Sequence, residues 1–150
     1  MSIHDPAVDN ADGALMDWHG WIPAPGTPGA TITKLAAGEL PDGQKVRLAP
    51  GQSVVGVLPS ARVASGQWAT AKFHLASTST QAVSLRVLLA RDSGEGESFF
   101  KSFVKVTQDL QLVRVSGKFL SSHASLRLEL KNAGVADAEF VVSRPTVRIA

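Results

Sequence analysis

Alternation of apolar and polar residues is the clearest pattern along the chain, and it dominates residues 69–149. In Ser125–Lys131 every second residue is leucine, and the residues between the leucines are polar or charged. A side-chain period of two is typical of a β-strand with one buried face. We therefore predict a strand whose residues Leu126, Leu128 and Leu130 face a core.

Several other segments alternate in the same way. The predicted strands are Ala69–Leu75, Val83–Leu89, Gln111–Phe119 and Glu139–Ile149. Clusters rich in serine, glycine and asparagine separate them, as expected for turns. Because Pro145 has no backbone N–H to donate, we expect it to break or bulge the last segment and to lie near a sheet edge.

Turn-forming residues crowd the first 60 positions and leave room only for short strands. These fit at Ala30–Leu35, Gln44–Leu48 and Ser53–Leu58, and a short helical turn fits within Asp9–Trp18. Many short strands with regular turns predict an all-β fold, an antiparallel jelly-roll-like β-sandwich. We expect a single domain, with residues 1–28 as an extended N-terminal arm and residues 29–150 as the sandwich.

Composition narrows the possible chemistry. A chain of 150 residues can bury a core, and the absence of cysteine excludes disulfides and thiolate zinc sites. No basic and then apolar leader begins the sequence, and no run approaches the roughly 20 apolar residues of a membrane-spanning helix. We expect no membrane partner and a location in the cytoplasm, or outside the cell if the chain is an excised module.

Charge is distributed unevenly between the two ends of the chain. The first 17 residues hold four aspartates and no lysine or arginine, whereas residues 61–150 hold 12 basic and 7 acidic side chains. The acidic arm, including Asp5, Asp9 and Asp12, is a solvated tail, folds back on the basic body, or docks on a neighbouring subunit. We keep these three aspartates as candidate partner contacts.

Aromatic residues are the other candidate contacts. Trp18, Trp21 and Trp68 either fill or close the sandwich or stack on a ligand. Trp68 opens a strand in the opposite phase to Phe73, which predicts an outward side chain. Phe99 and Phe100 are adjacent on a predicted strand and must point to opposite faces, so one of them is expected to be exposed.

Motifs for catalysis are missing from the sequence. There is no Gly-x-Ser-x-Gly, no metal-type pair of histidines and no readable pair of catalytic carboxylates. We predict no enzyme activity, no catalytic residue, no cofactor and no metal. The acidic loop Arg91–Ser98 is either a solvated hairpin loop or a calcium loop. Without a basic run or a ladder of aromatics, we expect no nucleic acid partner.

The order of several short motifs resembles a known family. The motifs are Asp17–Trp21, Ser53–Val57, Gly66–Trp68, Val104–Thr107 and Phe140–Val142. Together they resemble the jelly-roll modules of the galactose-binding-like and carbohydrate-binding-module superfamily, an architecture shared with phage decoration (cement) proteins. The resemblance implies a β-sandwich and a glycan partner held by exposed tryptophans. The chain departs from the pattern in having no tyrosine, and in having Arg144 to Val147 where the family has an acidic residue.

These observations lead to two functional hypotheses. The first is a non-catalytic structural module, specifically a virion component such as a bacteriophage capsid decoration (cement) or tail-associated protein. Its partners would be neighbouring subunits, as a homo-oligomer or on a capsid protein, and it would be located in the virion or in host cytoplasm during assembly. The alternative is a carbohydrate-binding module that uses exposed tryptophan residues.

Overall fold

The computed structural model describes residues 13–14, 18–25, 29–36, 40, 42–59, 61–92 and 100–150, and for residues 13, 14 and 100 it describes the backbone alone. Within these ranges every regular element is a β-strand. The strands are β1 (Gly13–Ala14), β2 (Ile22–Pro23), β3 (Thr31–Lys34), β4 (Gln44–Leu48), β5 (Ser53–Leu58), β6 (Trp68–Ser77), β7 (Val83–Arg91), β8 (Phe100–Val106), β9 (Gln111–Lys118), β10 (Leu126–Asn132), β11 (Ala138–Val142) and β12 (Thr146–Ile149). None of the described residues forms a helix long and apolar enough to cross a membrane.

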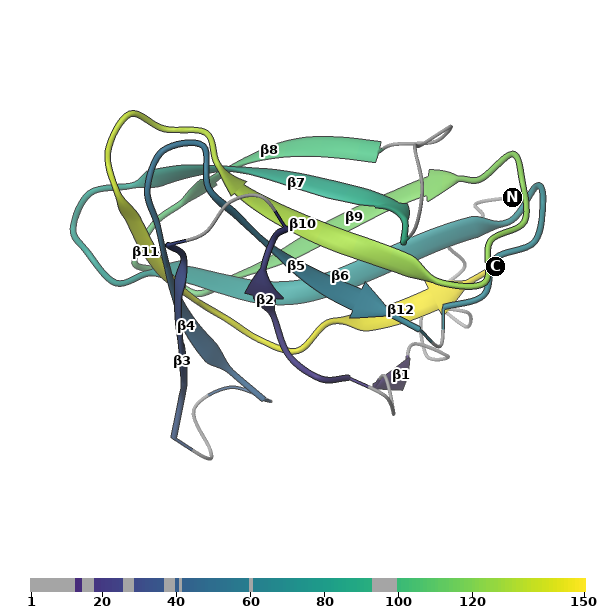
Figure 1. Ribbon diagram of the computed structural model, residues 1–150, viewed down its shortest axis with the longest axis horizontal. Helices are drawn as coiled ribbons and strands as arrows, with labels where there is room; N and C mark the ends of the chain where they lie inside the picture. Colours follow the sequence, from purple (N-terminus) through teal and green to yellow (C-terminus); the bar gives the residue numbers. More distant parts are fainter. Residues whose placement is uncertain are drawn as a thin grey trace.

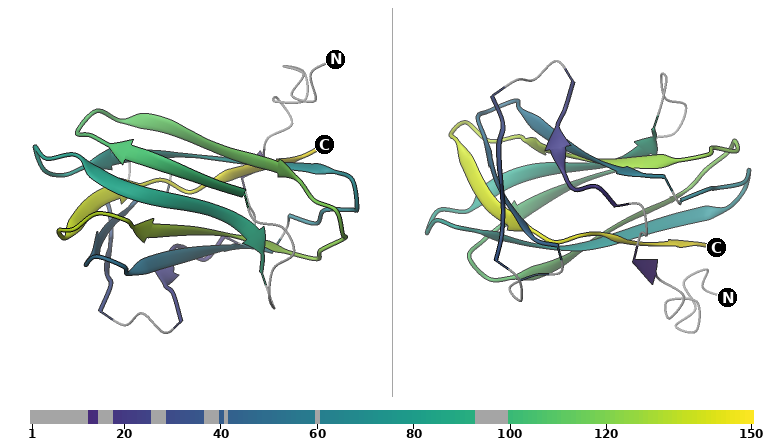
Figure 2. Two further views of the ribbon diagram at one scale, coloured as in Figure 1. Left: turned by 90° about the horizontal axis from the view of Figure 1, so that it is seen from above. Right: turned by 60° about the horizontal axis from the view of Figure 1, so that its bottom comes forward.

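The strands form two antiparallel sheets that pack face to face (Figures 1 and 2). One sheet has five strands in the order β2-β5-β10-β7-β8. The other follows the order β1-β12-β6-β11-β4-β3, with β9 pairing beside β6. The predicted all-β antiparallel sandwich is therefore confirmed.

The core lies between the sheets, where the alternation placed it. Leu126, Leu128 and Leu130 of β10 are fully buried, and across the sandwich so are Phe73 of β6 and Phe140 of β11. Burial of a large apolar side chain stabilises a fold by about 1.5–3 kcal/mol. The strict period of two in these strands is thus the main sequence signal for the fold.

Pro145 breaks the last predicted strand, as expected, but it does not lie at a sheet edge. Both resulting strands, β11 and β12, pair with β6, and each has a second neighbour on its other side. Ser143 bridges the break: its N–H donates to the His74 carbonyl at 3.0 Å, and its hydroxyl accepts from the His74 N–H at 2.9 Å. A proline is tolerated here because it occupies the gap between two ladders.

The segment around Trp21 is part of the sandwich. β2 pairs with β5, the Ala24 N–H donates to the Ser53 carbonyl at 3.0 Å, and Trp21 is 1% exposed. The boundary placed at residue 28 therefore does not coincide with a boundary in packing. At residues 13–14 the chain forms β1, so the expected helical turn is wrong there, and the rest of that segment up to residue 17 lies outside the described residues.

Gly56 lets Trp18 approach the inner face of β5. A Cβ atom at position 56 would lie 2.5 Å from Trp18 Cη2 and 3.2 Å from Trp21 Cε3. Real carbon atoms do not approach so closely, so any larger residue must displace the tryptophan. Close packing of the Trp18 ring against β5 therefore requires glycine at position 56.

We expect Gly56→Ala to lower the free energy of unfolding by about 1–3 kcal/mol, because it overpacks this site. Urea unfolding measures the change. Combined with Trp18→Leu, which removes the clashing ring, the double variant should lose less than the sum of the single losses. Strictly additive losses would contradict the contact as the cause.

Candidate functional site

The outer face of the five-stranded sheet gathers charged side chains from adjacent strands. Because side chains alternate along a strand, the leucines of β10 point inward and Arg127, Glu129 and Lys131 point outward. Strand pairing extends this outward surface across β5, β7 and β8. We call it the basic face. Its outward residues are Ile22, Ser53, Val55, Val57, Ser84, Arg86, Leu88, Ala90, Lys101, Phe103, Lys105, Arg127, Glu129 and Lys131.

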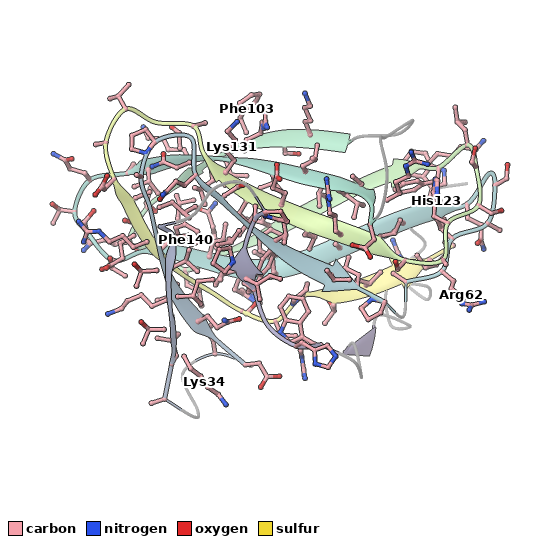
Figure 3. All side chains as sticks on the ribbon, in the orientation of Figure 1. Lys34, Arg62, Phe103, His123, Lys131 and Phe140 are labelled. Carbon is pink, nitrogen blue, oxygen red and sulfur yellow. The ribbon has the colours of Figure 1, made fainter. Side chains whose placement is uncertain are left out.

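Phe103 presents an exposed ring on the basic face. It lies on the edge strand β8 and is 76% exposed. Its register partner is Arg86 on β7, and the next partner in the same row is Lys131 on β10. Since adjacent strands lie about 4.8 Å apart, the row spans about 10 Å. Phe103 and Lys131 lie near each other over this part of the sheet in Figure 3.

Arginine side chains are held close to the sheet beneath this row. The Arg86 side chain is 28% exposed, and its Nη2 lies 3.9 Å from Glu129 Oε1. Two rows further along the sheet, Arg127 Nη1 donates to the Asp92 carbonyl at 3.4 Å. The outward-pointing Leu88 is only 7% exposed, which fits long charged side chains lying along the apolar surface with their stems. Both guanidinium groups thus lie against the sheet, each near one acceptor group.

The described residues of the basic face include few groups that could act as an acid or a base. Among its residues Glu129 is the single carboxylate, and none is a histidine. Glycoside hydrolysis commonly uses a pair of carboxyl groups that flank the scissile bond. No group of three histidine, aspartate or glutamate side chains within the described ranges could hold a metal ion. A flat ring beside fixed hydrogen-bond donors suits an extended ligand.

Two of the predicted tryptophan contacts pack against the core of the sandwich. The Trp21 ring is 5.8 Å from the Phe73 ring, centre to centre, and its Nε1–H donates to the Ser143 carbonyl at 3.2 Å. Trp18 is half-buried, with its ring 5.5 Å from that of Trp21. Of the two alternatives for Trp21, filling the sandwich or stacking on a ligand, the structure therefore shows the first. No ligand can reach this ring in the structure.

Trp68 faces away from the basic face. It begins β6, pairs with Lys118 of β9 and points outward, as its phase predicts. The side chain is half-buried on the other sheet. Trp68 and Phe103 thus lie on opposite outer surfaces of the sandwich and cannot serve one site.

The remaining predicted contacts are outside the described residues. These are Asp5, Asp9, Asp12 and Phe99, together with the side chain of Phe100. The same holds for residues 93–98 of the acidic loop. Their roles as partner contacts stay predictions.

A hollow lies beside the Trp18 segment, away from the basic face. It has a volume of about 240 Å³ and is lined by Trp18, His19, Gly20, Lys34, Asp42 and Gln44. Two of its polar groups are already engaged: Asp42 Oδ2 accepts from Arg144 Nη1 at 2.8 Å, and Gln44 Oε1 accepts from the Trp21 N–H at 2.8 Å. We therefore rank this hollow below the basic face as a ligand site.

Sequence reasoning missed Phe103 although a signal was present. In Lys101–Lys105 the phenylalanine shares the phase of two lysines, which predicts an outward ring. Arg86, Lys105, Arg127 and Lys131 also alternate with buried or partly buried apolar residues of their strands, and in the structure they lie on the outer face of the sheet. Alternation within a strand does not show which strands are neighbours, so it could not predict that these residues share one sheet.

Comparison with known proteins identifies the fold. No protein-family model matches the sequence, and no curated protein matches it. Solved structures do match, including the CBM22-1 xylan-binding domain of Xyn10C from Paenibacillus barcinonensis. That domain is 13% identical with a TM-score of 0.63, and the match covers 92% of each chain.

Two further modules match over most of their length. A CBM4 module is 13% identical with a TM-score of 0.63, and the match covers 87% of this chain and 95% of that one. The family 11 carbohydrate-binding module from Clostridium thermocellum, solved with a β-1,3-1,4-mixed-linked tetrasaccharide, is 15% identical with a TM-score of 0.58 and 89% of each chain covered. The predicted resemblance to the jelly-roll fold of these modules is therefore confirmed.

Proposed function

We propose that this chain is a non-catalytic module that binds a glycan on the basic face. The observation that carries the proposal is the exposed Phe103 ring next to the half-buried Arg86 side chain. An aromatic ring stacks on the apolar face of a sugar, while nearby charged groups hydrogen-bond its hydroxyls. The fold shared with a xylan-binding domain and with a module bound to a tetrasaccharide supports this function.

The virion hypothesis stays a prediction. Capsid or homo-oligomeric partners, and a location in a virion or host cytoplasm, gain no specific support from the described surface. Similarity of fold alone does not assign function, but the matched modules favour the glycan-binding alternative.

A binding screen with a stacking variant tests the proposal. The wild-type protein is screened against immobilised neutral and acidic glycans, and the affinity for the best ligand is measured by calorimetry. We expect Phe103→Ala to weaken binding about tenfold, which corresponds to about 1.4 kcal/mol. Since the ring is largely exposed, the variant should keep the wild-type unfolding midpoint.

Leu112→Ala is the matched control, because Leu112 is 52% exposed on the opposite outer surface. It should bind as the wild type does. Failure of the wild-type protein to bind any glycan would reject the function. Wild-type affinity in Phe103→Ala together with a loss in His19→Ala would keep the function and move the site to the hollow beside Trp18.

A further inference from the structure

We infer that the ligand of the basic face is an acidic glycan, one whose sugars carry carboxylate or sulfate groups. This inference rests on the proposed glycan-binding function and adds the chemical class of the ligand. It is carried by the composition of the face. Five of its side chains are cationic, namely Arg86, Lys101, Lys105, Arg127 and Lys131, and Glu129 is the single anionic one.

Among the described residues, few of the positive charges of this face have an acidic partner. No ion pair joins Lys101, Lys105 or Lys131 to another described residue, and the contact of Arg86 with Glu129 is long, at 3.9 Å. On the other sheet one cation has two acidic neighbours. There Arg47 lies 3.4 Å from Asp137 and 3.9 Å from Glu139. An excess of one sign over a surface attracts ligands of the opposite sign.

The positions of these cations suit an extended polymer. Lys101, Phe103 and Lys105 follow one another on the outward side of β8, about 6.6 Å apart, because strand residues rise about 3.3 Å each. Lys131 lies two strands away in the row of Phe103. A sugar stacked on the ring would therefore have cations on three sides. Neighbouring acidic sugars of the same chain could reach them.

Protection of a sheet edge does not explain the whole arrangement. Lysines on an edge strand hinder unwanted strand pairing, and this accounts for Lys101 and Lys105 on β8. Arg86, Arg127 and Lys131 are on β7 and β10, which have a partner strand on both sides. Edge protection therefore does not explain these three cations, whereas binding of an anionic ligand does.

Nucleic acid fits the face less well than a glycan. Binding of single strands relies on several aromatic side chains on which successive bases stack. Phe103 is the single aromatic residue among the described outward positions of the basic face, and Leu88, Val55 and Val57 on the same face are aliphatic. One ring and scattered cations match a sugar chain with spaced acidic groups.

Direct affinity measurements test the inference with the intact chain. The probes are oligosaccharides of polygalacturonate (carboxylate), of carrageenan (sulfate), and of xylan and mixed-linked β-glucan (neutral), with a single-stranded oligonucleotide as an unrelated polyanion. At 0.1 M salt, where the screening length is about 10 Å, we expect an acidic glycan to bind at least about tenfold more tightly than a neutral one. At 1 M salt, where it is about 3 Å, this preference should disappear.

Paired charge variants locate the effect. Lys101→Gln with Lys105→Gln removes two charges from the basic face, and Lys45→Gln with Lys118→Gln removes two exposed charges from the other outer surface. We expect the first pair to weaken acidic-glycan binding by about fivefold or more and the second to leave it within about twofold. Both variants lose the same net charge, so equal losses would mean non-specific attraction and overturn the inference.

Each remaining outcome also either supports or overturns the inference. Preference for the carboxylate or for the sulfate probe supports the inference and names the acidic group. Salt-insensitive binding of neutral and acidic glycans with equal affinity overturns it and leaves the proposed function standing. Tighter binding of the oligonucleotide than of every glycan overturns both, as does no glycan binding at any salt concentration.

Discussion

Trp21→Ala is expected to lower the free energy of unfolding by about 3–5 kcal/mol, the range for truncating a large buried aromatic residue. Trp21 is 1% exposed, packs against Phe73 and Trp18, and donates its Nε1–H to the Ser143 carbonyl. The alanine variant leaves a cavity and an unpaired carbonyl. Since domains have only about 5–15 kcal/mol of stability, this single change removes a large share. Urea denaturation followed by fluorescence or circular dichroism measures it.

Two further variants separate the contribution of the Trp21 ring from that of its hydrogen bond and from that of the surrounding segment. Trp21→Phe keeps a ring against Phe73 but loses the donor, so it should cost less than the alanine variant. Ile22→Ala changes the adjacent residue, which is 49% exposed on β2, and should shift stability by no more than about 1 kcal/mol. An unchanged unfolding midpoint in Trp21→Ala would show that this segment is not part of the cooperative core.

Asn132→Asp should be similarly destabilising at neutral pH, with a loss of about 3–5 kcal/mol. Asn132 is 2% exposed at the end of β10. Its Nδ2 donates to the Leu48 carbonyl at 3.0 Å and to the Ala136 carbonyl at 2.9 Å, and its Oδ1 accepts from the Gly134 N–H at 2.9 Å. A carboxylate cannot donate, so an anionic oxygen would face two carbonyl oxygens in a buried site.

The loss should depend on pH in a defined direction. Burial and the two carbonyls disfavour the ionised form, so the pKa of the new carboxyl is higher in the folded state than in the unfolded one, where it is about 3.9. Below the unfolded-state pKa the group is protonated in both states and the penalty is smallest. As the pH rises from that value through the folded-state pKa the penalty grows, and above the folded-state pKa it is constant.

Gln81→Glu provides the control. It also replaces an amide with an acid, but Gln81 is exposed in the turn between β6 and β7. Its stability relative to wild type should vary little between pH 4 and pH 7 by the same unfolding measurement. A flat difference between Asn132→Asp and wild type over this range would contradict a buried, raised-pKa carboxyl at position 132.

Local alternation was sufficient to predict most strands but not their neighbours. The Leu126–Leu130 pattern located a strand and its buried face because side-chain direction is a property of one strand. The pairing of β10 with both β5 and β7 depends on contacts far apart in the sequence. The basic face could not be assembled from the sequence for this reason, although alternation gives the side-chain direction of each cation within its own strand.

Trp21 illustrates the same limit at a single residue. Its burial depends on Gln44, whose side chain bonds the Trp21 backbone, and on Ser143, which accepts the ring N–H. These partners lie 23 and 122 positions away along the chain. The sequence around Trp21 is rich in proline and glycine and therefore resembles an exposed arm. Only the folded arrangement distinguishes an anchor from an arm.

The central place of β6 has a consequence for how the protein is made. β6 pairs with β9, β11 and β12, all of which follow it in the chain, and Trp68 exchanges both backbone hydrogen bonds with Ala150. At translation rates of about 5–20 residues per second, β6 emerges from a ribosome several seconds before its last partner. During that time Phe73 and Leu75 have no sheet to enter. The nascent chain is thus expected to engage general chaperones and to complete folding only after β12 has been synthesised.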